Sequence, residues 1–127
     1  MARVLGIGGV FFKARDPGGL TTWYREVLGL EVQDWGGVVF RPEVMAAHPG
    51  AGTVLSPFES DTTYLAPSTK DFMINLAVDD LDAVLANCAA HGVDATVLPD
   101  APNGRFAHIL DPEGTKIELW QPTPMPT

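Results

Sequence analysis

Apolar side chains recur at helical spacing in two stretches of the chain. In residues 16–29 the apolar positions fall three or four residues apart, on one face of a helix: Leu20, Trp23, Tyr24, Val27 and Leu28. Asp16 is a good helix cap, Pro17 suits the first helical position, and Gly29 is a typical stop. Residues 79–92 repeat the spacing, in Leu81, Val84, Leu85, Cys88 and Ala89. The pattern predicts two helices whose apolar faces pack on a core.

Short apolar segments around both helices predict strands. In the first half they cover residues 10–15, 30–32, 37–41 and 53–58, and in the second half 72–78, 95–98, 105–110 and 116–120. The stretches 42–52 and 59–70 are rich in turn-forming residues and predict loops. Each half thus follows the order strand, helix, three strands. We expect one domain with two modules, at about residues 4–58 and 71–121.

The last predicted strand carries a carboxylate among apolar residues. The sequence Asp111-Pro112-Glu113-Gly114 is typical of a type I turn, in which the aspartate accepts hydrogen bonds from the backbone ahead. Because side chains alternate along a strand, Glu118 shares one face with Lys116 and Trp120. A carboxylate is costly to bury without a cation or donors. Glu118 therefore lies at an exposed edge, or it meets a ligand, a metal or a hydrogen-bond partner.

Composition narrows the classes of function. The chain has 127 residues and a formal net charge of −8, so it lacks the basic surface that nucleic acids require. Its one cysteine, Cys88, excludes an intrachain disulfide. We find neither a signal peptide nor an apolar run of the ~20 residues that span a membrane. We expect a soluble cytoplasmic protein with no nucleic-acid or membrane partner.

Three segments resemble a known superfamily. They are FFKARDPGGLTTWYREVLGLEV, FMINLAVDDLDAVLANCAAHGV and GRFAHILDPEGTKIELWQP, and together they cover most of the chain. In these segments the chain is similar to the vicinal oxygen chelate superfamily, which includes glyoxalase I, bleomycin-resistance proteins, fosfomycin-resistance enzymes and extradiol dioxygenases. The resemblance implies an α+β fold in which two paired βαβββ modules form a half-open, cup-shaped sheet. It also implies a small-molecule ligand or a divalent metal inside the cup, and a homodimer.

The metal site of the family is incomplete in this sequence. Family enzymes place one ligand on the first strand and another on a later strand of each module, and Glu118 matches the last of these positions. The other three positions fall at or beside Gly9, Met73 and Leu55, none of which is a histidine or a carboxylate. Divalent ions need three or four protein donors. A divalent metal is therefore possible but disfavoured, and the cofactor stays unassigned.

Two further polar residues are candidates beside Glu118. His108 precedes the turn and lies close to Glu118 if the two strands form a hairpin; the alternative is a satisfied core histidine. Asn75 faces the cup if Met73 does; the alternative is an amide satisfied by neighbouring backbone. For Glu118 the alternative to a function is a carboxylate paired with a cation, namely Lys116, Lys13 or Arg105.

Five aromatic residues on or beside predicted strands are candidates for the walls of a pocket: Trp35, Phe40, Phe58, Phe106 and Trp120. Flat aromatic walls bind planar or cationic organic molecules. Any one of the five is as well explained as part of the core. We expect one or two of them to contact a ligand.

Three functions fit these residues. The leading hypothesis is a binding protein similar to the bleomycin-resistance branch, which holds a small organic molecule in the cup without a complete metal site. The second is a metal-dependent lyase or dioxygenase of the glyoxalase type, with Glu118 as metal ligand and His108 as its partner. The third is a metal-free enzyme in which Glu118 is the general base, its pKa raised by apolar surroundings.

Overall fold

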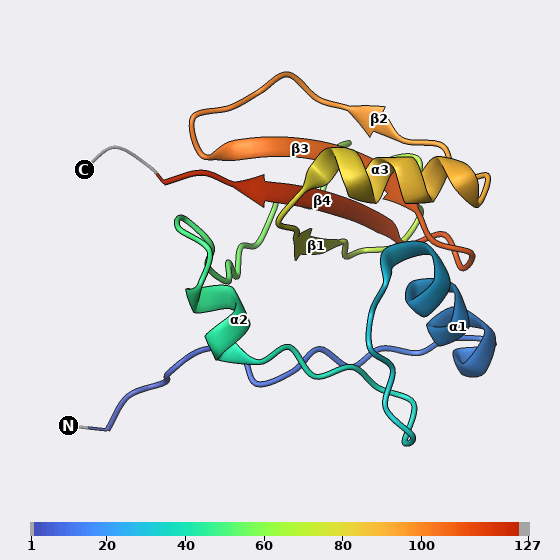
Figure 1. Cartoon of the computed structure of the whole chain (residues 1–127), viewed down its shortest axis with the longest axis horizontal. Coiled ribbons are helices and arrows are strands. Elements are labelled where there is room, and N and C mark those ends of the chain that lie inside the picture. The colour runs from blue at the N-terminus through green and yellow to red at the C-terminus, as the bar shows by residue number, and fades with distance from the viewer. Residues whose placement is uncertain (1, 125–127) are drawn as a thin grey trace.

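One open, four-stranded sheet, with α1 and α3 packed against one of its faces, organises the molecule (Figure 1). The computed structural model describes residues 2–124. Its helices are α1 (Pro17–Leu28), α2 (Pro42–Ala46) and α3 (Leu81–Ala90). Its strands are β1 (Ile74–Ala77), β2 (Thr96–Val97), β3 (Gly104–Leu110) and β4 (Lys116–Pro122). The predicted α+β class is confirmed, and all four strands lie within or beside the segments predicted in the second half.

The sheet has the order β1-β4-β3-β2, so β4 is an inner strand with a partner on each side. β1 runs parallel to β4, and β3 runs antiparallel to it. The register sets Asn75 on β1 and His108 on β3 directly opposite Glu118 on β4. Residues opposite one another on neighbouring strands point to the same face. The sheet therefore carries these three side chains in one row.

The core fills the space between the sheet and the two long helices. Alternate residues of β3 and β4 point into it and are almost fully buried: Ala107, Ile109, Ile117 and Leu119. Cys88 and Leu81 of α3 and Val27 of α1 contact them, and Trp23 and Tyr24 pack at the border, as the helical pattern predicts. The opposite face of the sheet is left to Glu118 and its neighbours.

The two helices begin and end as the sequence predicts. Asp16 Oδ1 accepts a hydrogen bond from the backbone N–H of Gly19 at 3.0 Å, and Asp80 Oδ1 accepts one from Ala83 at 3.1 Å. Each aspartate thus satisfies a free donor of the first helical turn. Gly29 ends α1 with φ +71°, the left-handed conformation that glycine adopts without strain.

The predicted turn before β4 is present and tied to α1. The backbone N–H of Gly114 donates to the carbonyl of Asp111 at 3.0 Å, and Gly114 has φ +81°. Asp111 Oδ1 accepts from the N–H groups of Glu113 and Thr115, at 2.8 and 3.0 Å. Asp111 Oδ2 accepts from the hydroxyl of Tyr24 at 2.9 Å. The turn is therefore held both by its own backbone and by the first helix.

The strands predicted in the first half do not form. Residues 10–15, 30–32, 37–41 and 53–58 lie outside the sheet, and the only pairing in this part of the described chain is an isolated bridge between Val32 and Val38. Figure 1 shows the chain before α1 and the chain between α1 and α2 without regular structure and apart from the sheet. A strand needs a neighbour to satisfy its backbone, whereas a helix satisfies its own. Phe11 and Leu55, 94% and 85% exposed, have no such neighbour.

The predicted loop at residues 42–52 contains the short helix α2. Pro42 begins this helix, because its fixed φ suits the first helical position and its missing N–H costs nothing there. The second predicted loop, 59–70, is free of helix and strand as expected.

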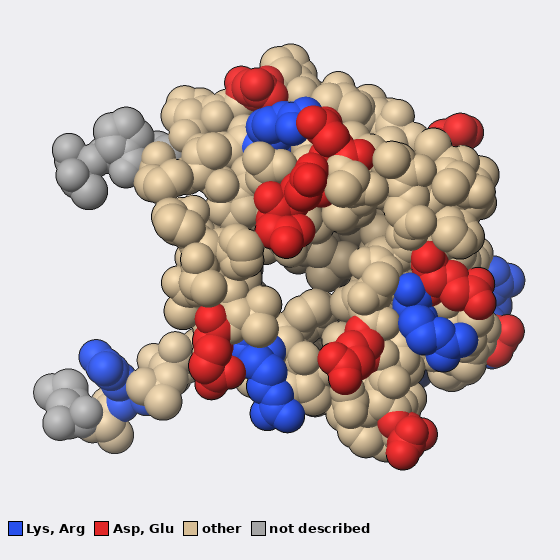
Figure 2. Space-filling view, viewed as in Figure 1, with Lys and Arg blue, Asp and Glu red and all other residues tan. Residues whose placement is uncertain are grey.

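Charged side chains are spread over the surface, and acidic ones gather at the start of α3 (Figure 2). Arg105 lies among them: its Nη2 donates to Asp82 Oδ1 at 2.9 Å, and its Nε lies 3.8 Å from Asp100 Oδ1. Both carboxylates are largely exposed, so these ion pairs contribute little to stability. Within residues 2–124, no helix combines the length and the apolar character needed to cross a membrane.

Candidate functional site

Glu118 lies at the centre of a hydrogen-bonded cluster on the face of the sheet away from the helices. Asn75 Nδ2 donates to Glu118 Oε1 at 2.8 Å, and His108 Nε2 lies 2.7 Å from Glu118 Oε2. Because an ionised carboxylate only accepts hydrogen bonds, Nε2 carries a hydrogen in this arrangement. The structure thus brings together three of the residues that the sequence singles out. Glu118 is on an inner strand, which removes the reading of a carboxylate at an exposed edge.

Tyr64 completes the cluster and is the residue that sequence reasoning missed. Its hydroxyl donates to Glu118 Oε2 and lies 3.3 Å from His108 Nε2. Its ring packs edge-on against the imidazole of His108, with 5.3 Å between the ring centroids. Tyr64 comes from the loop 59–70, between the two halves of the chain. The only sequence signal was a single aromatic residue in an otherwise polar, turn-rich loop.

Part of the cluster is shielded from water, although Asn75 and the 40% exposed Tyr64 lie at the surface, and the pKa values of Glu118 and Tyr64 are shifted. The side chains of His108 and Glu118 are only 11% and 12% exposed. Burial by itself raises the pKa of Glu118, but hydrogen bonds from Tyr64, His108 and Asn75 lower this pKa by more, so the net shift is downward. Burial and the bond to Glu118 raise the pKa of Tyr64 to about 12. Glu118 is therefore ionised and Tyr64 protonated at neutral pH, and the raised carboxyl pKa expected for a general base is wrong.

No lysine or arginine forms an ion pair with Glu118 among the described residues. Arg105 turns toward Asp82 and Asp100, as described above. The ammonium group of Lys116 donates to the backbone carbonyls of Tyr64 and Ala66 instead. The negative charge of Glu118 is thus balanced by hydrogen-bond donors rather than by lysine or arginine, which corrects the expectation of a structural ion pair.

Three of the five candidate aromatic residues lie near this cluster. Phe106 and Trp120 are opposite one another on β3 and β4, on the face of Glu118, and their rings stack at 6.2 Å with 7° between the planes. The indole N–H of Trp120 donates to the carbonyl of Asn103 at 3.0 Å. Phe58 packs edge-on against Tyr64, with 5.7 Å between the ring centroids. One edge of the cluster is therefore aromatic.

The other two aromatic candidates lie elsewhere. Trp35 and Phe40 belong to the unpaired first half and are 71% and 68% exposed. The ring of Trp35 lies over Gly37, two residues further along the chain. Within residues 2–124, neither Trp35 nor Phe40 packs against another aromatic ring. The structure does not bring them to the cluster, because the strands that were expected to carry them do not join the sheet.

The donors around Glu118 do not fit a divalent metal of the family type. Besides the carboxylate they comprise one imidazole, one phenol and one amide, and both carboxylate oxygens already accept hydrogen bonds. Such an ion needs three or four good ligands. Over the described part of the chain, no group of three or more His, Cys, Asp or Glu side chains is close enough to hold one. No chemical step is therefore derived through a metal.

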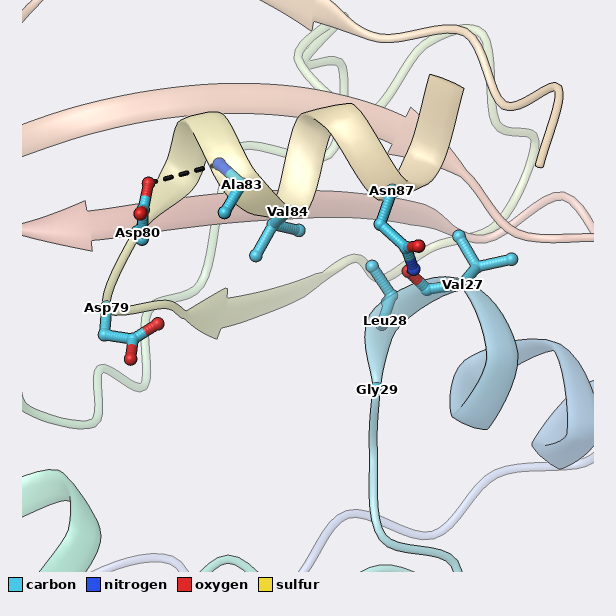
Figure 3. A pocket seen from close by; sticks show the side chains of 8 residues that line it. All are labelled: Val27, Leu28, Gly29, Asp79, Asp80, Ala83, Val84 and Asn87. Carbon is cyan, nitrogen blue, oxygen red and sulfur yellow. Dashed lines mark hydrogen bonds between the residues drawn. The ribbon is translucent and has the colours of Figure 1, made fainter. Parts of the chain in front are cut away.

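A shallow cavity of about 190 Å³ lies in the helix layer, away from the cluster (Figure 3). Side chains from the end of α1 and from α3 line it, among them Val27, Val84 and Asn87. Asn87 Nδ2 donates to the carbonyl of Val27 at 2.7 Å, and Asp80 caps α3. These polar groups already serve the helices, so the cavity offers few free partners for a ligand.

Comparison with known proteins places the chain in a family. Residues 9–120 match the glyoxalase-like domain. The chain belongs to this glyoxalase-like family. No curated protein is similar enough to count as a match.

Solved structures agree with the family at the level of the fold. The glyoxalase-like chain is 22% identical to TnmS3, an antibiotic binding protein from Streptomyces sp. CB03234, over 87% of this chain and 88% of that one, with a TM-score of 0.51. It is 20% identical to a glyoxalase/dioxygenase from Nostoc punctiforme, over 97% and 99% of the two chains, with a TM-score of 0.52. At these identities the likeness shows the fold, and the expected glyoxalase-type fold is confirmed.

A third likeness is partial. A glyoxalase/bleomycin resistance protein from Streptomyces sp. CB03234 is 35% identical, over 39% of this chain and 45% of that one, with a TM-score of 0.36. The match spans less than half of either protein.

Proposed function

We propose that this glyoxalase-like protein binds a small organic molecule on the sheet face around Glu118, without a metal ion. The observation that carries the proposal is the hydrogen-bonded cluster of Tyr64, Glu118, His108 and Asn75 beside aromatic rings, in which Tyr64 and Asn75 are exposed to a ligand. Ligand sites combine apolar and aromatic walls with a few fixed polar groups. The rigid sheet positions three of the four polar residues, so little ordering is required on binding.

The polar groups of the cluster retain hydrogen-bonding capacity. The amide oxygen of Asn75 and the hydroxyl oxygen of Tyr64 are acceptors beyond the bonds they donate to Glu118. Phe58 and Phe106 supply flat apolar surface beside them, and the largely buried Trp120 stacks on Phe106. The ligand class that fits is a planar organic molecule with polar substituents. TnmS3, an antibiotic binding protein, shares the fold, which supports a small organic molecule as the ligand.

A thermal-shift screen with a panel of planar aromatic compounds, antibiotics included, tests the proposal. For the best compound, Phe58→Ala should weaken binding about tenfold, since a lost aromatic contact is worth about 1 kcal/mol or more. Trp35→Ala is the matched control, because Trp35 is a similarly exposed aromatic residue outside the cluster. Equal losses for both variants, or none for Phe58→Ala and Glu118→Ala, would contradict this binding face.

A metal-dependent function is tested in the same preparation. Native mass spectrometry of tag-free protein incubated with zinc, nickel, manganese and ferrous iron reads the stoichiometry directly. One metal ion per chain, lost in Glu118→Gln, would overturn the metal-free proposal.

A second candidate function is metal-free acid–base catalysis centred on His108. The observation that favours it is the contact of 2.7 Å between His108 Nε2 and Glu118 Oε2, since a buried carboxylate beside an imidazole fixes its tautomer and orientation. In this second function, the imidazole of His108 exchanges a proton with the bound compound, and Glu118 orients that imidazole. Turnover of a bound compound that disappears in His108→Ala, while binding persists, would favour catalysis over binding alone.

A further inference from the structure

Lys116 occupies an unusual place for a lysine. It shares the face of β4 with Glu118, yet it is only 7% exposed. A buried ammonium group is costly unless its hydrogens find acceptors. Within residues 2–124 it forms no ion pair, and its acceptors are two backbone carbonyls of the loop 59–70.

Two of the three contacts of Lys116 are with one residue of that loop, Tyr64. Nζ donates to the carbonyl of Tyr64 and, at 3.1 Å, to the carbonyl of Ala66. Nζ also lies 4.9 Å from the centroid of the Tyr64 ring, at cation–π distance. Lys116 thus contacts both the backbone and the ring of Tyr64.

Besides Lys116, Tyr64 contacts Glu118 and His108 through its hydroxyl, and Phe58 and His108 through its ring. These contacts hold the side chain and not the backbone of the loop. Its backbone forms only local turns, such as Ala66 N–H to Thr63 at 3.1 Å. A second lysine, Lys70, ties the end of the loop by donating to Thr115 Oγ1 at 2.8 Å, but it contacts a side chain rather than the loop carbonyls. A loop held by turns alone has many conformations. Lys116 is therefore the sheet residue that binds the backbone of the loop at Tyr64.

We propose that Lys116 is a positioning residue that holds the hydroxyl of Tyr64 on Glu118. By binding the loop from β4, Lys116 fixes Tyr64 in place before a ligand binds. Tyr64 is the one residue of the cluster that does not come from the sheet. The consequence for ligand binding rests on the function proposed above, whereas the positioning itself is a property of the free protein. The two can therefore be tested separately.

The free protein is tested by ¹⁹F NMR after replacement of tyrosine with 3-fluorotyrosine, whose phenol titrates at lower pH. The chain has two tyrosines, and Tyr64→Phe assigns their signals. In Lys116→Met, which keeps the length of the side chain but removes its donors, the signal of residue 64 should move toward that of exposed fluorotyrosine. Its pKa should fall, by up to the difference between about 12 and the ordinary 10.0.

Lys70→Met is the matched control, because it removes the other lysine near this loop and leaves both carbonyl contacts intact. Tyr64 should keep its signal and its pKa in this variant. An unchanged signal and pKa in folded Lys116→Met, or equal changes in both lysine variants, would overturn the proposal.

A measurement on the unaltered protein covers the case in which Lys116→Met does not fold. The terminal methylene protons of Lys116 should show nuclear Overhauser contacts to the Tyr64 ring and an upfield ring-current shift. Their absence would overturn the proposal.

The same variant separates positioning from ligand binding. We expect Lys116→Met to bind the best compound of the aromatic panel about tenfold more weakly, since one hydrogen bond to a preformed group is worth about that much. A displaced Tyr64 with unchanged affinity would support the positioning role and overturn the proposed binding face instead.

Discussion

The two halves of the chain contain helices of the same kind but differ in what lies beside them. α1 and α3 both begin at an aspartate cap and both face the core. Next to α3 the apolar segments pair into the sheet, and next to α1 they stay unpaired. A helix closes its hydrogen bonds within one segment, whereas a strand depends on a second segment. Similar sequence patterns in the two halves therefore give a helix in each half, but strands of the sheet only in the second half.

The same difference separates buried from exposed apolar surface. Leu119 of β4 is fully buried between the sheet and α3, whereas Leu55, in a segment with the same predicted role, is 85% exposed. The candidate site follows the same division: three of its four polar residues lie in the second half, and Tyr64 lies in the link between the halves.

The largest expected difference between the halves concerns these two leucines. Leu119→Ala should lower the free energy of unfolding by about 2 to 5 kcal/mol, through lost burial and the cavity left behind. Leu55→Ala, the same change at an exposed position, should alter it by less than about 0.5 kcal/mol. Urea unfolding followed by circular dichroism measures both.

A large loss in Leu55→Ala would contradict the contrast and mean that this leucine is covered in solution. The homodimer implied by the resemblance stays a prediction, and it would provide such a cover. Sedimentation at several protein concentrations would then show whether Leu55→Ala shifts the chain toward the monomer.

The helix caps should show the opposite behaviour, with equal effects in both halves. Asp16→Ala and Asp80→Ala each remove one capping hydrogen bond, of 3.0 and 3.1 Å. Each should cost about 1 kcal/mol of unfolding free energy. Thermal unfolding of the two variants measures this, with Asp79→Ala as control beside the second cap. A loss confined to Asp80→Ala would mean that α1 contributes little to the stability of the fold.

The smallest expected effect is a dependence of stability on acidic pH that comes from Glu118 in the second half. The pKa of Glu118 is lower in the folded chain than in the unfolded one, so its stabilisation is present above the unfolded value and is lost as pH falls through the folded value. Glu118→Gln should therefore reduce acid sensitivity, by less than about 1 kcal/mol. Unfolding midpoints between neutral and acidic pH measure it.

Tyr64 should give the complementary alkaline effect. Its pKa is raised to about 12, so its stabilisation is complete below the ordinary 10.0 and is lost as pH rises through about 12. Tyr64→Phe should remove this alkaline loss, measured as the unfolding midpoint between neutral and alkaline pH.

The acid-pH prediction for Glu118→Gln has a matched charge control in Glu31→Gln, at an exposed position of the first half. An equal change in acid sensitivity in both variants would contradict the role given to Glu118.

Much of the second half was predictable from local signals. An aspartate cap, apolar residues at helical spacing and a following glycine predict both α1 and α3. The sequence Asp111-Pro112-Glu113-Gly114 predicts the turn that joins β3 to β4. A tight turn between two apolar segments also predicts that His108 and Glu118 lie close together. These features depend on bonds between residues near one another in the chain, so the sequence alone determines them.

The tertiary structure decided the rest. The contact between Asn75 and Glu118 depends on a parallel pairing of β1 with β4, which no turn specifies. Tyr64 reaches Glu118 across 54 residues of sequence, and Lys116 reaches the carbonyl of Tyr64 across 52. Contacts at such separations depend on how the chain packs as a whole, because no local conformational preference encodes them. The sequence by itself therefore determined the helices, the turn and the central carboxylate, and only the packing decided which donors surround that carboxylate.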